Sequence, residues 1–426
     1  MLSVAALLLA ANTSAVNAPE IEAAKVPLSF VKSSTPHGAS RGPKGQGGLH
    51  SNFNRNAGGV PGIDSLTNFT SQFTAAGFDP VGNPNSVWPY EMVGRAPERN
   101  ERTELHTPII PVILDLLDSS GNVATYNGVP LTFDPTAKVT AVLRSPLFQK
   151  FQYFSGNTQF TDGLMRAEFW DRIRHEGDGD DGYHVIMNPD VKETLRMQIP
   201  FGAWEFFVDA NGNPEGAIVD PNTFSNLLFP PTFPVDNSTV IGAAELSGAM
   251  TTRDLSVLFF NNVYLGNSGG CCVIGFHSYD LEPGDATNGN LPRRYVMAYA
   301  SWIDSGLFLG GFEDITAISH ELSETFNDPF VDDVTPWWLS VDPSGAFGGN
   351  CQDNLETGDV VEVMVTNLAV FPIQMNGFTY HPQNEAMFPW FAFESPSPAR
   401  KGAYSFPDNT TLLGLSPGPL HPGCVP

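Results

Sequence analysis

The sequence predicts an α+β fold in which a mixed β-sheet packs against one amphipathic helix and many loops connect the elements. Apolar runs of strand length, rich in β-branched residues, recur from about residue 106 to about residue 310. One stretch, residues 312–327, shows the apolar period of a helix instead. The chain of 426 residues also contains 41 Gly and 36 Pro, which favour turns and loops.

The first part of the chain differs from the rest in composition. Residues 1–18 carry an apolar run followed by small residues ending at Val16-Asn17-Ala18, which is typical of a secretory signal peptide. Residues 19–102 are rich in Gly and Pro, and we expect a leader or linker there. The folded domain is then expected to occupy residues 103–426. Because no later run of about 18 apolar residues occurs, the sequence predicts a secreted protein without a membrane span.

Several segments have the pattern of strands, and two have that of helices. Alternating or continuous apolar residues predict strands, and an Asn-Gly pair predicts a hairpin between two of them. A second amphipathic helix is expected at residues 158–174. The predicted strands lie within residues 108–117, 139–148, 194–202, 254–265, 269–280 and 293–304, with the hairpin at 205–216.

The helix at residues 312–327 is the centre of the functional prediction. At about 100° per residue, Ile318 and Leu322 fall on one face, which we expect to be buried. His320, Glu321 and Glu324 fall on the other, which we expect to face a cleft. Asp314 is a plausible N-cap, and the helix should end before Asp328-Pro329, because a residue preceding proline avoids helical angles.

His320 and Glu324 lie one helical turn apart and can bind the same ion, with Glu321 beside them. This is the spacing that H-E-x-x-H gives to zinc hydrolases, with a glutamate in place of the second histidine. The competing interpretation is a solvated charged face on an amphipathic helix. With only 9 histidines in the chain, the position of His320 on this polar face favours a metal or catalytic site.

A hydrolytic zinc site needs a third protein ligand, which must come from elsewhere in the chain. Glu356 is the first candidate, and Asp359 could orient a ligand from behind it. His277, which follows the paired cysteines, is a reserve ligand, although a lone histidine after a strand is usually structural. Weaker candidates for the third ligand are His381, Asp328 and Asp353.

Four cysteines, an even number, suit an oxidising compartment and two disulfides. Since adjacent cysteines rarely pair with each other, we expect Cys271 and Cys272 each to bond with either Cys351 or Cys424. The sequence does not distinguish the two pairings. A thiolate metal site is the alternative, but the C-x-x-C spacing typical of one is missing.

The charge of the chain bears on its partners. It has 21 basic and 46 acidic residues, and 21 − 46 gives a net charge of −25. A charge of this sign disfavours binding to nucleic acid or to an anionic membrane surface. Cationic, neutral or metallic partners are favoured, and the oligomeric state is not indicated.

The segment SHELSETFNDPF followed by CQDNLETGD resembles a group of secreted bacterial proteins that carry S-H-E-x-x-E, then D-P, then E-x-x-D. At the helix this group is similar to the zincin metallopeptidases, and exordium-like plant proteins are a remote relation. The resemblance covers about residues 270–410 and implies a zincin-like fold. It implies that His320, Glu324 and Glu356 bind the metal and that Glu321 is the general base.

Two functions follow as hypotheses. The first is a secreted metal-dependent hydrolase, a zinc metallopeptidase acting on peptides or proteins. The carboxylate-rich ligand set also admits Mn²⁺ or Ca²⁺. The alternative is a non-catalytic extracellular binding or structural protein, associated with the cell wall, on the same scaffold. An enzyme needs an open cleft over His320, whereas a structural site would be closed by a further protein ligand.

Overall fold

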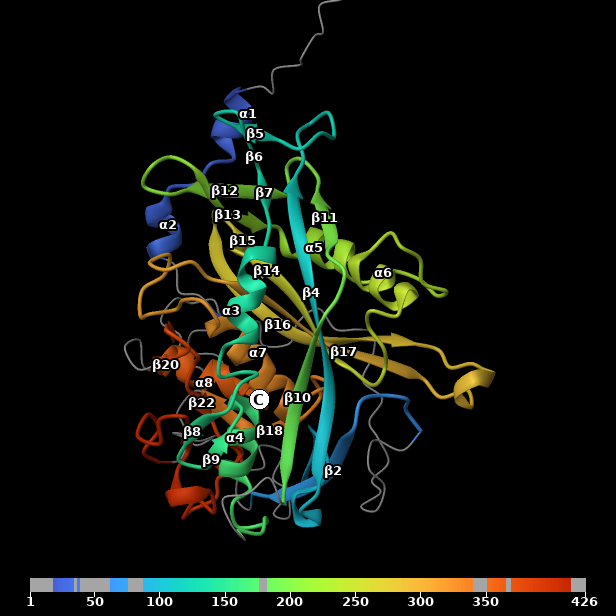
Figure 1. The fold of residues 1–426 in the computed structure, drawn as a ribbon, viewed down its shortest axis with the longest axis vertical. Helices are drawn as coiled ribbons and strands as arrows, with labels where there is room; N and C mark the ends of the chain where they lie inside the picture. Colours follow the sequence, from blue (N-terminus) through green and yellow to red (C-terminus); the bar gives the residue numbers. More distant parts are fainter. Residues whose placement is uncertain are drawn as a thin grey trace, which may run out of the picture.

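The computed structural model describes residues 18–33, 37–38, 62–75, 87–175, 182–339, 351–364 and 369–414. It confirms the α+β class, since a curled β-sheet is combined with helices (Figure 1). The predicted signal peptide lies almost entirely outside these residues. None of the helices in the described part of the chain is long and apolar enough to cross a membrane.

The main sheet has eleven strands within the described residues. It is mixed, because β4 lies parallel to both β10 and β14, whereas β16 is antiparallel to both β15 and β17. Three short strands pair with β16 or β4 at the side of the main path: β1 (His37–Gly38), β7 (Thr132–Phe133) and β11 (Leu195–Ile199). In spatial order the main path is β10 (His184–Val191), β4 (Arg102–Leu116), β14 (Leu255–Asn261), β17 (Arg293–Trp302), β16 (Gly270–Glu282), β15 (Val263–Asn267), β13 (Pro214–Val219) and β12 (Trp204–Val208).

The sheet separates two apolar cores. Successive residues of β14 alternate between them, with Val257 and Phe259 in one core and Leu258 and Phe260 in the other. Figure 1 shows the corresponding helices on opposite sides of the long β4 strand. The first core is covered by α4 (Phe160–Glu168), α7 (Thr316–Asn327) and α8 (Thr357–Met364), and the second by α5 (Pro221–Leu228) and α6 (Val240–Ser247).

Most of the strand predictions are confirmed, including the hairpin of β12 and β13. The strand predicted at residues 139–148 is wrong, because its first part is the helix α3 (Val139–Leu143). Val139 and Val142, three residues apart, are both buried there, so packing of one helical face outweighs the weak strand preference of valine. The helix predicted at residues 158–174 is present as the shorter α4.

Parts of residues 19–102 belong to the folded core. This range contains α2 (Leu28–Ser33) and the antiparallel pair β2 (Asn68–Thr74) and β3 (Val87–Val93). Val31 and Met92 are fully buried in the same core as α7. The described segments of this range therefore pack with the rest of the chain.

Candidate metal centre

The predicted central helix is α7, from Thr316 to Asn327. It ends before Asp328-Pro329, as predicted. Asp314 is not its N-cap, because the residue before the helix is Ile315 and no side chain caps it. Asp314 has a φ of 43°, and its Oδ1 accepts hydrogen bonds from the backbone N–H groups of Ile315 and His381. This carboxylate joins the start of the helix to a distant loop.

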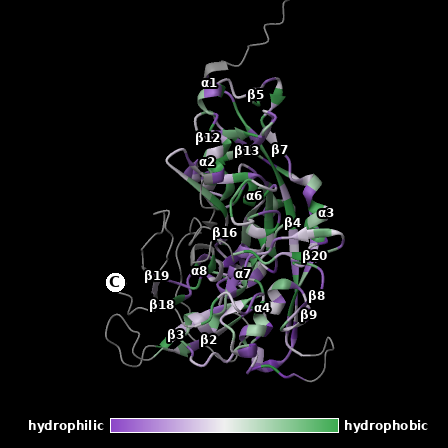
Figure 2. Cartoon of the chain, turned by 90° about the vertical axis from the view of Figure 1, so that its left-hand side faces the viewer, coloured by the Kyte–Doolittle hydropathy of each residue, from purple (hydrophilic) through white to green (hydrophobic). Residues whose placement is uncertain are grey.

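All twelve residues of α7 are buried, polar and apolar alike. Ile318 and Leu322 are buried as predicted. His320 and Glu324 were expected to face a cleft, but both are 0% exposed, because α8 packs over this side of the helix. Figure 2 shows the hydrophilic colour of α7 inside the lower half of the molecule. The polar face of the helix is thus enclosed by protein.

His277 points from β16 to the polar face of α7 and is completely buried. Its Nδ1 lies 3.4 Å from Glu324 Oε2, 3.7 Å from Glu321 Oε2 and 3.9 Å from Glu356 Oε2. Two residues before it on the strand, Gly275 leaves room for the helix, since a Cβ there would lie 2.6 Å from Glu321 Oε1. The reserve ligand of the sequence analysis therefore lies at the centre of the site.

His320 is held from two sides. Its Nδ1 lies 3.1 Å from Gln383 Oε1, and the amide of Gln383 also donates to the carbonyl of Gly358 at 2.9 Å. Its Nε2 pairs with Glu324 Oε1 at 3.1 Å, and because Nδ1 is held by Gln383, Nε2 is the ring nitrogen that a metal ion would take from this pair. A ligand histidine is commonly oriented in this way, by a hydrogen bond to its other ring nitrogen.

The segment that leads into α8 closes the site. Glu356 Oε1 accepts a hydrogen bond of 3.1 Å from Asn354, and Asp359 Oδ1 lies 3.7 Å from His320 Nε2. Glu324 Oε1 accepts backbone N–H groups at the start of α8, from Gly358 at 3.1 Å and Asp359 at 3.4 Å. These donors favour an ionised Glu324, as helix N-terminal groups generally do for anions.

A further carboxyl group, that of Glu385, was missed by the sequence analysis. It is fully buried, accepts a hydrogen bond of 3.4 Å from Thr357 and acts electrostatically on His320 and Glu324. Its only local signal is the polar sequence Gln-Asn-Glu within an aromatic stretch. We use the name α7 cluster for His277, His320, Glu321, Glu324, Glu356, Asp359 and Glu385.

The α7 cluster does not include the three weaker candidates for the third ligand. Asp328 is buried, and its carboxylate accepts the backbone N–H groups of Asp332 at 3.0 Å and Asp333 at 3.2 Å. His381 pairs with Asp314 at 2.7 Å. Asp353 is half-buried on β19 (Cys351–Asn354). The geometry of Asp328 and His381 indicates structural roles.

Burial and mutual repulsion set the protonation of the cluster. Burial raises the pKa of Glu321 to about 7, although both histidines oppose this shift. Burial, with Glu324 nearby, also raises the pKa of Glu356 well above its ordinary value. For Glu324, His320 and His277 outweigh burial and hold the pKa well below that of a free carboxyl group. Without a cation, only some of these carboxylates can be ionised together.

The donor set fits a divalent cation. Within the described part of the chain, neither ring nitrogen of His277 and neither carboxylate oxygen of Glu321 has a hydrogen-bond partner. Buried polar atoms are nearly always hydrogen-bonded, so atoms left without a partner indicate a ligand or water. Imidazole nitrogens with carboxylate oxygens are ligands for Zn²⁺ and Mn²⁺.

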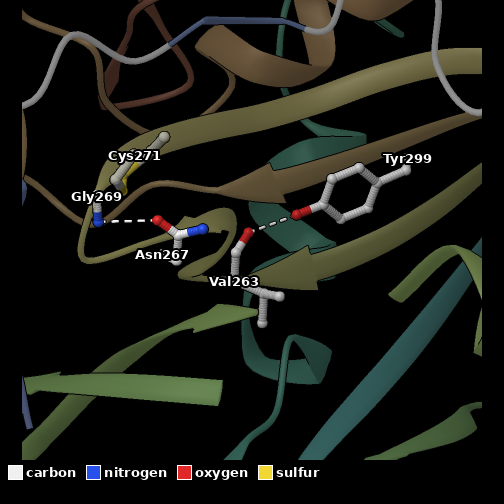
Figure 3. The surroundings of a disulfide bond; sticks show 6 residues. Val263, Asn267, Gly269, Cys271 and Tyr299 are labelled. Atoms are coloured by element: carbon white, nitrogen blue, oxygen red, sulfur yellow. Dashed lines mark hydrogen bonds between the residues drawn. A yellow bond between two sulfur atoms is a disulfide. The ribbon is translucent and has the colours of Figure 1, made fainter. Parts of the chain in front are cut away.

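The expected disulfides are corrected by the structure. Cys271 and Cys272 are bonded to each other, with a cis peptide between them and Cα atoms 3.1 Å apart (Figure 3). The expectation that adjacent cysteines would not pair is therefore wrong for Cys271 and Cys272, whose Cα atoms lie closer than the distance of about 3.8 Å across a trans peptide. The side chain of Cys351 and all of Cys424 lie outside the described residues.

A cavity of about 310 Å³ lies away from the α7 cluster, between β12, β13 and the start of α5. It is lined by residues such as Trp204, Asp220 and Thr223, and no residue of the cluster borders it.

Comparison of the chain with protein-family models, with curated proteins and with solved structures finds no match. The function of the protein is therefore inferred from the α7 cluster itself.

Proposed function

We propose that this protein is a metal-dependent hydrolase, with peptides or proteins as substrates. His320 and Glu324 would bind the metal, with Glu356 as predicted and with Asp359, whose carboxylate lies 3.7 Å from His320 Nε2. One observation carries the proposal: Glu321, at the position of the base in H-E-x-x-H helices, has no hydrogen bond to its carboxylate in the described structure. A group that already served a structural purpose would be hydrogen-bonded.

The residues of the chain divide the chemistry between them. When bound, a divalent cation would polarise the scissile carbonyl and lower the pKa of a water molecule towards about 7. Glu321 takes the proton of the attacking water on a carboxylate oxygen and passes it to the leaving amine. The carboxylate of Glu321 is buried and has no hydrogen bond in the described structure, so both its oxygens are placed to accept and then release a proton. Gln383 keeps Nε2 of His320 directed at Glu324.

The metal follows from the ligand charges. Two or more carboxylates with one histidine form a harder and more negative donor set than three histidines do. This set suits Zn²⁺, and it favours Mn²⁺ or Ca²⁺ more than an ordinary zinc hydrolase site would. Secretion and the likeness to zincins are part of the same proposal, and they rest on the N-terminal composition and on the SHELSETFNDPF motif.

A non-catalytic metal-stabilised protein is the second candidate. The observation that favours it is closure, because His277, His320, Glu321 and Glu324 are all 0% exposed. A structural metal site is closed by protein ligands, whereas a catalytic site keeps a position open for water or substrate. In this second case, removal of the metal would lower stability without loss of any activity.

The Glu321→Gln variant tests the proposal. It should keep its metal, measured by plasma mass spectrometry, and lose about 100-fold or more of its turnover on quenched fluorescent peptides. Glu168→Gln is the matched control, because Glu168 is also fully buried but belongs to α4 and not to the cluster. Full activity in Glu321→Gln would favour the non-catalytic candidate over the hydrolase. Wild-type protein without metal would contradict the metal site altogether.

A further inference from the structure

The ligand atoms of the α7 cluster form two groups that meet at Glu324. In the first group, His320 Nε2 lies 3.1 Å from Glu324 Oε1 and 3.7 Å from Asp359 Oδ1. In the second, His277 Nδ1 lies 3.4 Å from Glu324 Oε2 and 3.9 Å from Glu356 Oε2. The two histidines thus approach different oxygens of one carboxylate, which is the arrangement of a bridging ligand.

Glu321 lies between the two groups. Its Oε1 is 3.9 Å from His320 Nε2, and its Oε2 is 3.7 Å from His277 Nδ1. The ligand atoms of His277, Glu321 and Glu324 all lie within 4.8 Å of one another, as do those of His320, Glu324 and Asp359. The first group is thus small enough to surround one ion, and so is the set of His277, Glu321 and Glu324, to which Glu356 adds an oxygen 3.9 Å from His277 Nδ1.

The second group has its own evidence of a ligand. The imidazole of His277 is 0% exposed and lies among three carboxylates, yet neither of its nitrogens is hydrogen-bonded within the described residues. A cation beside His320 and Glu324 Oε1 would leave this ring with only the long contact of 3.4 Å to Glu324 Oε2, and with no hydrogen bond to its Nε2 within the described residues. A single ion therefore does not account for His277.

Charge leads to the same conclusion. The cluster holds five buried carboxyl groups, and the ion pairs described for them are with the two histidines. If all five ionise, one divalent cation offsets two of the five negative charges, and two cations offset four. Because buried charge is unfavourable unless it is compensated, two cations match this acidic cluster better than one cation does.

We propose that the α7 cluster binds two divalent cations, one beside His320 and Asp359 and one beside His277 and Glu356, with Glu324 bridging them. This inference rests on the proposed metal centre and extends it from one ion to two. Hydrolases with two metals, such as aminopeptidases and phosphatases, hold their ions about 3.5 to 4 Å apart and use them to stabilise attacking and leaving oxygens. Glu321, between the ions, keeps its position as the base.

Titration of the metal-free full chain with MnCl₂, followed by electron paramagnetic resonance, tests the proposal. The wild type should bind two equivalents and show the spectrum of a spin-coupled pair. His277→Gln should bind one equivalent with an uncoupled spectrum. Glu245→Gln is the control, because Glu245, Asp280 and Glu282 form a separate acidic group, and it should behave as the wild type does.

The outcomes separate this inference from the proposed function. One equivalent in the wild type, unchanged in His277→Gln, overturns the second site and leaves the hydrolase proposal intact. No Mn²⁺ binding overturns both. Two uncoupled equivalents, or two that persist in His277→Gln but not in Glu245→Gln, place the second ion elsewhere and overturn the inference. If His277→Gln does not fold, the coupling in the wild type alone decides.

Discussion

His184 and His277 are both buried histidines that point from a strand of the main sheet to a helix, and they differ in how their partners are arranged. His184 Nδ1 donates to Asp162 of α4 at 2.7 Å, and its Nε2 accepts a hydrogen bond of 3.3 Å from Arg166. Asp162 also accepts hydrogen bonds from Thr158 and from the backbone of Val185. His277 lies among three carboxylates of the α7 cluster, and no hydrogen bond of the described structure reaches its ring.

This difference distinguishes a structural histidine from one in a candidate functional site. At His184 the protein satisfies every ring nitrogen by itself, so the site needs no ligand and holds α4 against β10. At His277, three carboxylates surround one histidine, and neither ring nitrogen has a hydrogen bond within the described structure. Since unsatisfied buried polar atoms are costly, they persist where a ligand completes them. The following predictions test this distinction.

The largest effect is expected for Glu324→Ala. This change removes the carboxylate shared by both histidines, so metal affinity should fall by more than about 100-fold. Isothermal titration with ZnCl₂ or MnCl₂ measures the loss. Asp328→Ala is the comparison, because Asp328 is buried one residue beyond α7 but bonds to backbone groups. Equal loss in both variants would indicate general disruption instead of a ligand role.

Asp162→Ala should affect stability and leave metal binding unchanged. The change leaves His184 and the backbone N–H of Val185 without their acceptor in a buried position. Each buried donor left without an acceptor costs about 1 to 3 kcal/mol of unfolding free energy. Urea unfolding measures the cost, and metal analysis of the folded variant should give the wild-type content. Loss of metal would show that the two sites are not independent.

Glu168 provides a case with no histidine partner. Burial raises its pKa to about 8, with the backbone N–H of Phe388 and the charge of Arg172 opposing the shift. Because the folded state holds this proton more tightly than the unfolded state, the contribution of Glu168 to stability should fall as pH rises from about 4.5 to about 8. Glu168→Gln should remove this slope, giving a variant more stable than the wild type at pH 8, on the order of a few kcal/mol. Urea unfolding at several pH values measures both proteins. If the free energy of unfolding changes with pH in the same way for the wild type and Glu168→Gln, the prediction is contradicted.

A smaller effect is expected for Gln383→Leu. The change removes the hydrogen bond that fixes the His320 ring but leaves all proposed ligands in place. Loss of such an outer partner typically lowers metal affinity about 10- to 100-fold. Gln383→Glu, which keeps an acceptor for His320 Nδ1, should recover part of the affinity. An unchanged affinity in Gln383→Leu would mean that His320 is oriented by other contacts.

Local features of the site were predictable from the sequence. The helical period predicted α7 and the residue at which it ends. The spacing of His320, Glu321 and Glu324 predicted its polar face. The sequence analysis also proposed Glu356, Asp359 and His277 for the site, and each lies within 4 Å of a histidine or a glutamate of the cluster. Their roles as ligands or base remain predictions.

The failures come from contacts between distant parts of the chain. The burial of the polar face depends on α8 and on the segment around Glu385, which no local pattern places over α7. Asp314 was expected to cap the helix, but its partner His381 lies 67 residues away in sequence. In α3, burial of one helical face outweighs the strand preference of its valines, because that preference depends on context.

Anomalous diffraction from crystals of the full chain grown with MnCl₂ tests the central claim most directly, because it locates the ion as well as detecting it. We expect anomalous density adjoining Glu324, within about 2.0 to 2.2 Å of His320 Nε2 and a Glu324 oxygen. No such density is expected at Asp162 and His184. A map without density at Glu324, with the His277 ring hydrogen-bonded to ordered water, would contradict the assignment of the α7 cluster as a metal centre.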